Sequence, residues 1–399
     1  MPDFHKLDSS IPVAPIALMV MESAKGLGEL VNARLVEFRH DLHNTPGNDP
    51  AFQGYVKDEY RVKYANPRFG SGESKAQIYE SLRGKDVFIL TDVMNHSMTY
   101  KMYGYGNYYS PDDHYQDLKR VIAAINGKAR RINIIMPFLY EGRQHNKNNR
   151  ESLDAAVMFS ELYSMGISNF ITFDAHDPRI SNAAPISGFD NFMASPQFMK
   201  AIISEIDDLT VDKEHLTVIS PDEGALDRAV YFANVLNVDT GMFYKRRDYS
   251  KVVNGSNPIV AHEYLGSAID GKDVIIIDDM ISSGSSMIDT SRQLKKKGAK
   301  RVFICTTFGL FTNGMEVFDE GYKNGDFDAL ITTNLIYQNP DFMNREYYHI
   351  ADMSKFLATV IDFMNHDASL SNVITPTESI HSIIDKYNAR AAKAEDLFD

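Results

Sequence analysis

Short apolar runs recur along the chain, and each is followed by a polar turn and then by a stretch with helical spacing. Runs of strand length lie at 86–90, 132–136, 170–173, 216–219, 274–277 and 302–305. Strands buried on both faces of a parallel sheet show such continuous runs instead of alternation. Amphipathic stretches at 152–165, 224–236 and 286–297 lie between them. The pattern predicts βαβ units and an α/β fold with mainly parallel sheets flanked by helices.

The strand–helix pattern occurs twice, which predicts two tandem domains. One set of strands ends before residue 192 and a second begins near 216. We place the boundary at Ser195-Pro196, where small residues and a proline follow a polar loop. The expected parts are a domain at 1–195, a domain at 196–340, part of 341–365 packed back onto the first domain, and a polar tail at 366–399.

Two segments interrupt the pattern and predict surface loops or insertions. Residues 94–116 and 248–263 are rich in Tyr, Asn, Gly and Ser, which favour turns and irregular structure. The first of these contains an unusually Tyr-rich part at 97–115.

Composition narrows the class of protein. The 399 residues are 44% hydrophobic, as in a globular protein, and carry a formal net charge of −13. An acidic chain argues against general binding to nucleic acid or to anionic membranes. The chain has neither a basic start before a long apolar stretch nor an apolar run of membrane-spanning length, which predicts a soluble, cytoplasmic protein.

The single cysteine, Cys305, lies in the apolar run 301–305 and has no partner for an internal disulfide. This fits a reducing compartment. A buried strand residue is the expected role of Cys305, and a nucleophilic thiol is the alternative.

The strongest chemical signal is a strand that ends in two carboxylates and a loop of small hydroxyl residues. Asp278 and Asp279 follow the run 274–277, and Ser282, Ser283, Gly284, Ser285 and Ser286 lead into a helix. Ligands of open α/β sheets bind beyond the carboxyl ends of the strands, and a helix N-terminus attracts anions. Two carboxylates suit vicinal ribose hydroxyls, so this segment predicts a cradle for a sugar phosphate. The alternative is an acidic turn that only caps the helix.

This segment resembles the phosphoribosyl diphosphate loop of type I phosphoribosyltransferases and of ribose-phosphate diphosphokinases. In that loop an Asp pair is followed by two apolar residues, Asp-Thr, a small residue and Gly-Thr. Here Ser282 stands where the family usually has Asp, and Ser283 and Ser286 stand where it has Thr. The resemblance implies two tandem type I phosphoribosyltransferase-like domains and ribose 5-phosphate bound by residues Asp278, Asp279 and 282–286.

Two further segments resemble the ATP-binding segments of the diphosphokinases. Residues 69–73 are similar to their adenine-recognising loop Phe-Ser-Asp-Gly-Glu, and residues 143–147 to their Arg-Gln-Asp-Arg-Lys loop. The resemblance implies that ATP is bound by Phe69, Ser71, Gly72, Glu73, Arg143 and Gln144. Ser71, His145 and Asn146 depart from the family residues. Taken alone, the glycine-rich turn 69–73 predicts a plain loop.

The same resemblance implies the metal and the catalytic residues. His176, at the end of a strand, and Asp222, in a Ser-Pro-Asp segment, match the positions that hold Mg²⁺ with the nucleotide. Lys245 and Arg247 match the Lys-Arg-Arg at the base of a catalytic loop, where they would neutralise charge on the transferred diphosphoryl group. Without the resemblance, His176 is a structural histidine and 245–247 is a solvated surface turn.

The reaction implied is transfer of diphosphate from MgATP to the C1 hydroxyl of ribose 5-phosphate, by a homo-oligomer whose ATP sites are completed by a neighbouring subunit. Two alternatives stay open. One is a non-catalytic regulatory or scaffold subunit, suggested by Ser71, His145, Asn146 and Ser282. The other is a phosphoribosyltransferase that acts on a base, which explains the 278–286 loop but not the duplicated domain.

Overall fold

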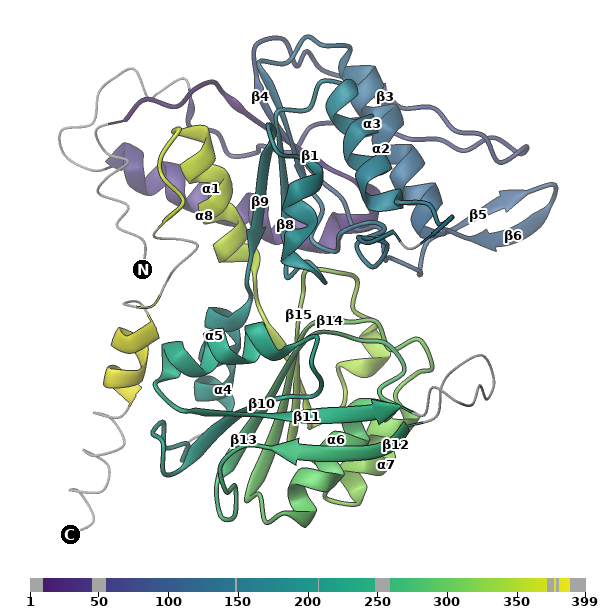
Figure 1. Cartoon of the computed structure of the whole chain (residues 1–399). Coiled ribbons are helices and arrows are strands. Elements are labelled where there is room, and N and C mark those ends of the chain that lie inside the picture. Colours follow the sequence, from purple (N-terminus) through teal and green to yellow (C-terminus); the bar gives the residue numbers. More distant parts are fainter. Residues whose placement is uncertain are drawn as a thin grey trace. The chain divides into compact units, whose positions relative to one another are not determined.

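The structure is a computed structural model that describes residues 10–44, 55–147, 149–206, 208–247, 259–371, 377 and 380–387. It divides into two compact units. The N-terminal unit comprises Met1–Ala194, Asn334–Asn339 and Asp352–Thr375, and the C-terminal unit comprises Ser195–Thr333, Pro340–Ala351 and Pro376–Asp399. Each unit is built around its own sheet (Figure 1).

The N-terminal unit has a five-stranded sheet in the order β1-β4-β7-β8-β9, and every neighbouring pair is parallel. The strands are β1 (Ile16–Val20), β4 (Asp86–Leu90), β7 (Arg131–Ile135), β8 (Asn169–Phe173) and β9 (Gly188–Phe192). The helices are η2 (Glu22–Ala24), α1 (Lys25–Asn44), α2 (Pro111–Ile125), α3 (Asp154–Ser164), η4 (Pro178–Ala183) and α8 (Ser354–Asn365). Helices α1 and α8 cover one face of the sheet and α2 and α3 the other (Figure 1). All five residues of β4 are buried as a result.

The C-terminal unit has a seven-stranded sheet in the order β12-β11-β10-β13-β14-β15-β16. The strands are β10 (Leu216–Ser220), β11 (Asp239–Arg247), β12 (Ile259–Leu265), β13 (Asp273–Ile281), β14 (Arg301–Gly309), β15 (Ala329–Thr333) and β16 (Tyr348–Ala351). The helices are α4 (Ser195–Glu205), α5 (Leu226–Leu236), α6 (Ser285–Lys296), α7 (Glu316–Lys323) and η5 (Pro340–Phe342). Only the edge pair β11–β12 is antiparallel.

The predicted α/β class, with two mainly parallel sheets flanked by helices, is therefore confirmed. Each of the six predicted strands is present within a residue or a few residues of its expected limits, and the three amphipathic stretches form α3, α5 and α6. Cys305 lies buried in β14, and burial raises the pKa of its thiol, which fits a core residue and not a nucleophile. None of the helices in the described ranges has the length and apolar character needed to cross a membrane.

The prediction of surface loops at 94–116 and 248–263 is wrong in part. The first segment contains the hairpin of β5 (Thr99–Met102) and β6 (Tyr105–Tyr108) and the start of α2. Tyrosines favour strands, and Tyr103 and Gly104 both have the positive φ that a two-residue hairpin turn needs. In the second segment, residues 259–263 belong to β12, whereas 248–258 lie outside the described residues. A small antiparallel pair, β2 (Tyr64–Ala65) and β3 (Gln77–Ile78), lies apart from the main sheets.

Both sheets contain the same ion pair at the amino end of neighbouring strands. Asp86, the first residue of β4, pairs in register with Arg131, the first residue of β7, and accepts its Nε at 3.0 Å and its Nη2 at 2.6 Å. Asp273 at the start of β13 pairs in register with Arg301 at the start of β14, at 2.9 Å and 2.6 Å. Both aspartates are buried. The shared feature agrees with a duplicated domain.

We expect Arg131→Met to lower the free energy of unfolding by on the order of 3 kcal/mol, because the buried Asp86 carboxylate loses its charged partner. Urea denaturation of the full chain measures this change. The matched control is Arg34→Met, which removes an exposed pair with Glu37 and should cost no more than about 0.5 kcal/mol. Equal losses in the two variants would contradict the structural role of the Asp86–Arg131 pair.

Candidate active site

A hydroxyl-rich turn joins the end of β13 to the start of α6 in the C-terminal unit. Gly284, at the N-cap of α6, has φ of +84°, and a Cβ added there would come within 2.3 Å of Phe318 Cζ. Both constraints exclude side chains, so the turn needs glycine at this position. Glycine also provides no side-chain acceptor for the first amides of α6, which leaves the positive end of the helix dipole for an anionic ligand.

The serines of this turn present their hydroxyls to solvent. Ser282, Ser285 and Ser286 are exposed and Ser283 is half-buried. The Ser282 carbonyl accepts the amide of Thr312 at 3.0 Å, and the Ser282 and Thr312 hydroxyl oxygens lie 3.2 Å apart. The turn is therefore fixed by its neighbour while its hydroxyls stay accessible.

The aspartate pair lies at the carboxyl end of β13. The Asp278 Oδ1 accepts the backbone amide of Asp279 at 2.8 Å and lies 3.8 Å from Nη1 of Arg228 on α5. Burial, and then the charge of Asp279, raise the pKa of the Asp278 carboxyl well above its ordinary value. Arg228 opposes this effect and Asp222 adds to it. The ionised form of Asp278 is therefore disfavoured at this position.

Asp222 follows β10, the direct neighbour of β13, so both strands bring carboxylates to the same edge of the sheet. Its Oδ1 accepts the amide of Gly224 at 3.0 Å, and its carbonyl accepts the Ser220 hydroxyl at 2.6 Å. These bonds fix the loop that carries Asp222. The sequence interpretation missed Arg228, because a single arginine on an amphipathic helix gives no signal of its own.

Lys245 and Arg247 lie in the last three residues of β11. Their backbones pair with His262 and Ile259 of β12, with a register shift between Arg246 and Arg247. The partner of Ser220, the last residue of β10, is Met242, so Lys245 and Arg247 extend beyond the carboxyl end of β10. Their side chains lie outside the described residues.

The N-terminal unit contains a tight turn at 69–73. The Phe69 amide donates to the Glu73 carbonyl at 2.7 Å, and the Gly72 amide donates to the Phe69 carbonyl at 2.9 Å. Gly72 has φ of +93°, and the Ser71 hydroxyl donates to Glu73 at 3.0 Å. The Phe69 side chain is 49% exposed, so an aromatic face is available beside a carboxylate.

Residues 143–145 lie next to the end of β8 in the same unit. The His145 Nε2 is 3.1 Å from Oδ2 of Asp177, and its ring lies 5.8 Å from that of His176. The side-chain Nε2 of Gln144 donates to the Ser152 carbonyl at 2.9 Å, while Arg143 and His176 are exposed. The structure therefore brings 143–145 together with His176, through a His145–Asp177 contact that the sequence interpretation missed.

Asp177 is held as a carboxylate. The hydrogen bond from Arg179 is the main cause that lowers its pKa to about 2, and His145 contributes a smaller electrostatic effect. In the part of the chain that the structure describes, no three His, Cys, Asp or Glu side chains group closely enough to hold a metal ion by themselves. His176 belongs to the N-terminal unit and Asp222 to the C-terminal unit.

Comparison with known proteins gives two family matches. Residues 16–166 match a family model described as the N-terminal domain of ribose phosphate pyrophosphokinase, and residues 189–326 match one described as the phosphoribosyl transferase domain.

Individual relatives give the same result. The chain is 30% identical over 305 residues to a ribose-phosphate pyrophosphokinase of Staphylococcus aureus, covering 75% of this chain and 86% of that one. It is 27% identical over 312 residues to that of Pasteurella multocida, covering 77% and 90%. The solved phosphoribosylpyrophosphate synthetase from Mycobacterium smegmatis superimposes with a TM-score of 0.68 at 22% identity, over 89% of this chain and 100% of that one, which shows a shared fold.

We expect Asp278→Asn to stabilise the ligand-free protein. Because the folded-state pKa of Asp278 is raised, the folded chain binds more protons than the unfolded chain above the ordinary pKa of an aspartate. Stability is therefore lost as the pH rises through that range. Asn removes this loss, and we expect a gain on the order of 1 kcal/mol at pH 7.

Urea denaturation at pH 5 and pH 7 measures the effect, with the gain larger at pH 7. The matched control is Asp289→Asn, an exposed position on α6, which should show no such pH-dependent gain. A lower stability of Asp278→Asn at pH 7 would contradict the conclusion that ionised Asp278 destabilises the ligand-free protein.

Proposed function

The chain belongs to the ribose-phosphate pyrophosphokinase family, and on that premise we propose that it transfers the β,γ-diphosphoryl group of MgATP to the C1 hydroxyl of ribose 5-phosphate. The products are 5-phosphoribosyl 1-diphosphate and AMP. The observation that carries the proposal is the carboxylate pair Asp278–Asp279 near the end of β13, followed by the turn that leads to the open N-terminus of α6. The carboxylates suit the hydroxyls of a ribose phosphate, and the helix N-terminus suits its phosphate.

The proposed sugar-phosphate site follows from hydrogen-bonding capacity. The amides of α6 and the hydroxyls of 282–286 donate to the 5-phosphate, whose charge suits the positive end of the helix dipole. Asp278 and Asp279 accept hydrogen bonds from the vicinal ribose hydroxyls. The hydroxyls of a neutral sugar give both carboxylates hydrogen-bond donors without adding charge.

The proposed nucleotide residues lie in the N-terminal unit. The exposed ring of Phe69 stacks on adenine, and Ser71, Gly72 and Glu73 offer hydrogen bonds to its edge. Arg143 and Gln144 bind phosphate or the base, a task that suits a permanently charged planar guanidinium. Phe69 and the 143–145 segment are held in place by the contacts described above.

The chemical step is a displacement at phosphorus. The C1 hydroxyl oxygen of ribose 5-phosphate bonds to the β-phosphorus of ATP, its proton is released, and the bond from the β-phosphorus to the oxygen that bridges it to the α-phosphorus breaks, so AMP leaves. Such transfers depend mainly on alignment and on stabilisation of charge. We assign the stabilising charges to Lys245 and Arg247, at the end of β11.

The donor set fits Mg²⁺ brought in with the nucleotide. The carboxylates Asp222, Asp278 and Asp279 crowd one edge of the sheet. Burial, and then the charges of Asp279 and Asp222, raise the pKa of Asp278, so a cation is favoured there. Carboxylate oxygens suit Mg²⁺, which keeps several waters and phosphate ligands. We propose His176 and Asp222 as its protein contacts. When bound, the ion supplies positive charge to the phosphate oxygens.

A non-catalytic regulatory homologue is the second candidate. It is favoured by Ser282, whose hydroxyl pairs with Thr312 where the family usually has a carboxylate, and by His145 paired with Asp177. A type I phosphoribosyltransferase is less favoured, because it leaves the match of residues 16–166 to the pyrophosphokinase N-terminal domain without a role. We also propose that the chain forms a homo-oligomer and acts in the cytoplasm.

The deciding experiment is AMP release from MgATP by the purified full chain, with and without ribose 5-phosphate, and the product identified by its mass. We expect release only with ribose 5-phosphate, and a product heavier than the sugar phosphate by one diphosphate group. Binding of both substrates without AMP release would favour the regulatory homologue. Tight binding of phosphoribosyl diphosphate plus a base, without ATP binding, would favour the transferase.

We expect Lys245→Ala to lower the turnover number by at least about tenfold to a hundredfold, because it removes one charge from the transition state. Steady-state rates at saturating substrates measure the change. The control is Lys323→Ala on the exposed surface of α7, which should keep the normal rate. A near-normal rate of Lys245→Ala would reject the role assigned to this lysine.

A further inference from the structure

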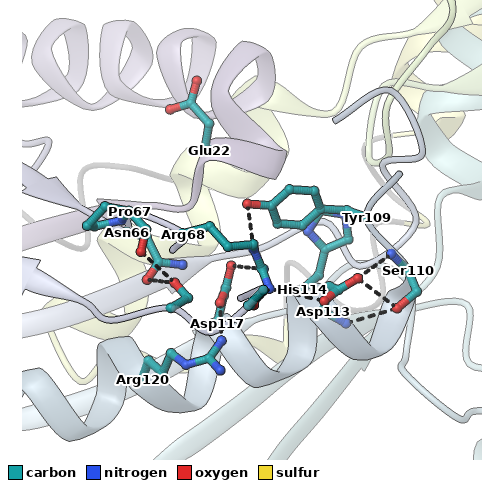
Figure 2. Close-up of polar contacts among 12 residues, drawn as sticks. Glu22, Asn66, Pro67, Arg68, Tyr109, Ser110, Asp113, His114, Asp117 and Arg120 are labelled. Carbon is teal, nitrogen blue, oxygen red and sulfur yellow. Dashed lines mark hydrogen bonds and ion pairs between the residues drawn. The ribbon is translucent and has the colours of Figure 1, made fainter. Parts of the chain in front are cut away.

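Arg68 directly precedes the turn at 69–73, yet its own side chain is almost completely enclosed. Only 7% of the side chain is exposed. Its guanidinium points toward helix α2 and lies among polar and aromatic side chains (Figure 2). Burying a guanidinium is costly unless it is well paired, so the contacts that it makes indicate what the burial achieves.

Three hydrogen bonds of the guanidinium join Arg68 to the turn and to α2. The Nη1 donates to the carbonyl of Gly72 at 3.0 Å, which ties Arg68 to the turn itself. The same nitrogen donates to Oδ1 of Asp113 at 3.2 Å, and Nη2 donates to Oδ2 of Asp117 at 3.0 Å (Figure 2). Arg68 thus links the 69–73 turn to two carboxylates on α2.

Two tyrosine rings enclose the guanidinium. The Arg68 Cζ lies 4.4 Å from the ring centroid of Tyr100 on β5 and 4.5 Å from that of Tyr109, and Nε donates to the Tyr109 hydroxyl at 3.2 Å. The two rings meet edge to face at 5.1 Å. Cation–π contacts of this kind are attractive, and more strongly so when water is excluded.

The β5–β6 hairpin also touches the turn directly. The amide of Tyr103 donates to the carbonyl of Gly70 at 2.9 Å. A Cβ added at Gly72 would come within 2.7 Å of the sulfur of Met102, so the Met102 side chain packs closely against the Gly72 backbone. The hairpin and Arg68 therefore both contact the turn.

Helix α2 is a rigid base for this arrangement. Asp113 closes a capping box with Ser110 at the start of the helix, and Asp117 also pairs with Arg120 one turn on (Figure 2). The same helix supports the segment before 143–145, because Tyr140 stacks on Tyr115 at 4.5 Å and donates to Asp112 at 2.5 Å. Both proposed nucleotide segments are thus attached to one helix.

We infer that Arg68 is a positioning residue for the nucleotide, and that the β5–β6 hairpin, through Tyr100, holds Arg68 so that the 69–73 turn is preformed before ATP binds. The inference rests on the proposed function, since it takes 69–73 as the turn that receives adenine. A turn fixed in advance loses less conformational entropy on binding. Arg68 and Tyr100 therefore contribute to ATP affinity without touching the ligand.

The experiment substitutes Tyr100, because removing its ring takes away one contact of the Arg68 guanidinium and leaves Arg68 paired with Asp113 and Asp117. Tyr100→Leu removes the aromatic face, and Tyr100→Phe restores it without the hydroxyl. The matched control is Tyr105→Leu, the same change at a ring on the same hairpin that is 76% exposed. All variants are made in the full chain, and their thermal midpoints are measured first.

Two readouts follow. Hydrogen exchange of the ligand-free protein reports on the amides of 69–73, two of which are bonded within the turn. Calorimetric titration gives the dissociation constants of MgATP and, separately, of ribose 5-phosphate. For Tyr100→Leu we expect faster exchange at 69–73 and an MgATP dissociation constant about threefold to tenfold higher, the weight of one cation–π contact. Ribose 5-phosphate affinity should stay normal, and Tyr100→Phe and Tyr105→Leu should both match the unaltered chain.

The inference is overturned if Tyr100→Leu binds MgATP as the unaltered chain does, or if exchange at 69–73 is unchanged. A parallel loss of affinity for both substrates, with faster exchange throughout the N-terminal unit, would show general structural support and also overturn it. Failure of the proposed function looks different: the unaltered chain then releases no AMP with ribose 5-phosphate, whatever the Tyr100 variants do. If the unaltered chain does not bind MgATP, both proposals fall.

Discussion

Parallel strands bring all their carboxyl ends to one edge of a sheet, and the chemistry of this chain depends on that constraint. Strands β10 and β13 are direct neighbours, so Asp222, after the first, and the pair Asp278–Asp279, at the end of the second, share an edge although more than fifty residues separate them. The helix that follows β13 points its N-terminus toward the same edge. Negative carboxylates and a positive helix end thus lie together without any loop of unusual length.

The sequence predicted the sheets because strands buried on both faces must be apolar throughout. The run 274–277 could therefore be recognised as a strand, and the Asp pair after it as the start of a site. Fold class and family are confirmed, whereas the roles of Phe69, Arg143, His176 and Lys245 remain predictions. The backbone of Lys245 lies at the carboxyl end of β11.

What the sequence did not predict are contacts between distant residues that follow no period. Arg68 meets Tyr109, Asp113 and Asp117, which lie 41, 45 and 49 residues further along the chain. No spacing rule links one arginine to these partners. The 94–116 segment was expected to be a loop because its composition is typical of turns, but the hairpin is stabilised by packing against the 69–73 turn, which only the tertiary structure shows.

The two ends of β13 show how position decides what an aspartate does. Asp273, at the amino end, receives two hydrogen bonds from Arg301, a geometry that satisfies the carboxylate and leaves it no need of a ligand. Asp278, at the carboxyl end, has another carboxylate beside it and Arg228 no nearer than 3.8 Å. The N-terminal sheet has the same closed pair at its amino end, Asp86 with Arg131. Because closed pairs hold strands together and crowded carboxylates favour added cations or hydrogen-bond donors, the structural ion pair and the proposed ligand-binding carboxylates lie at opposite ends of a single strand.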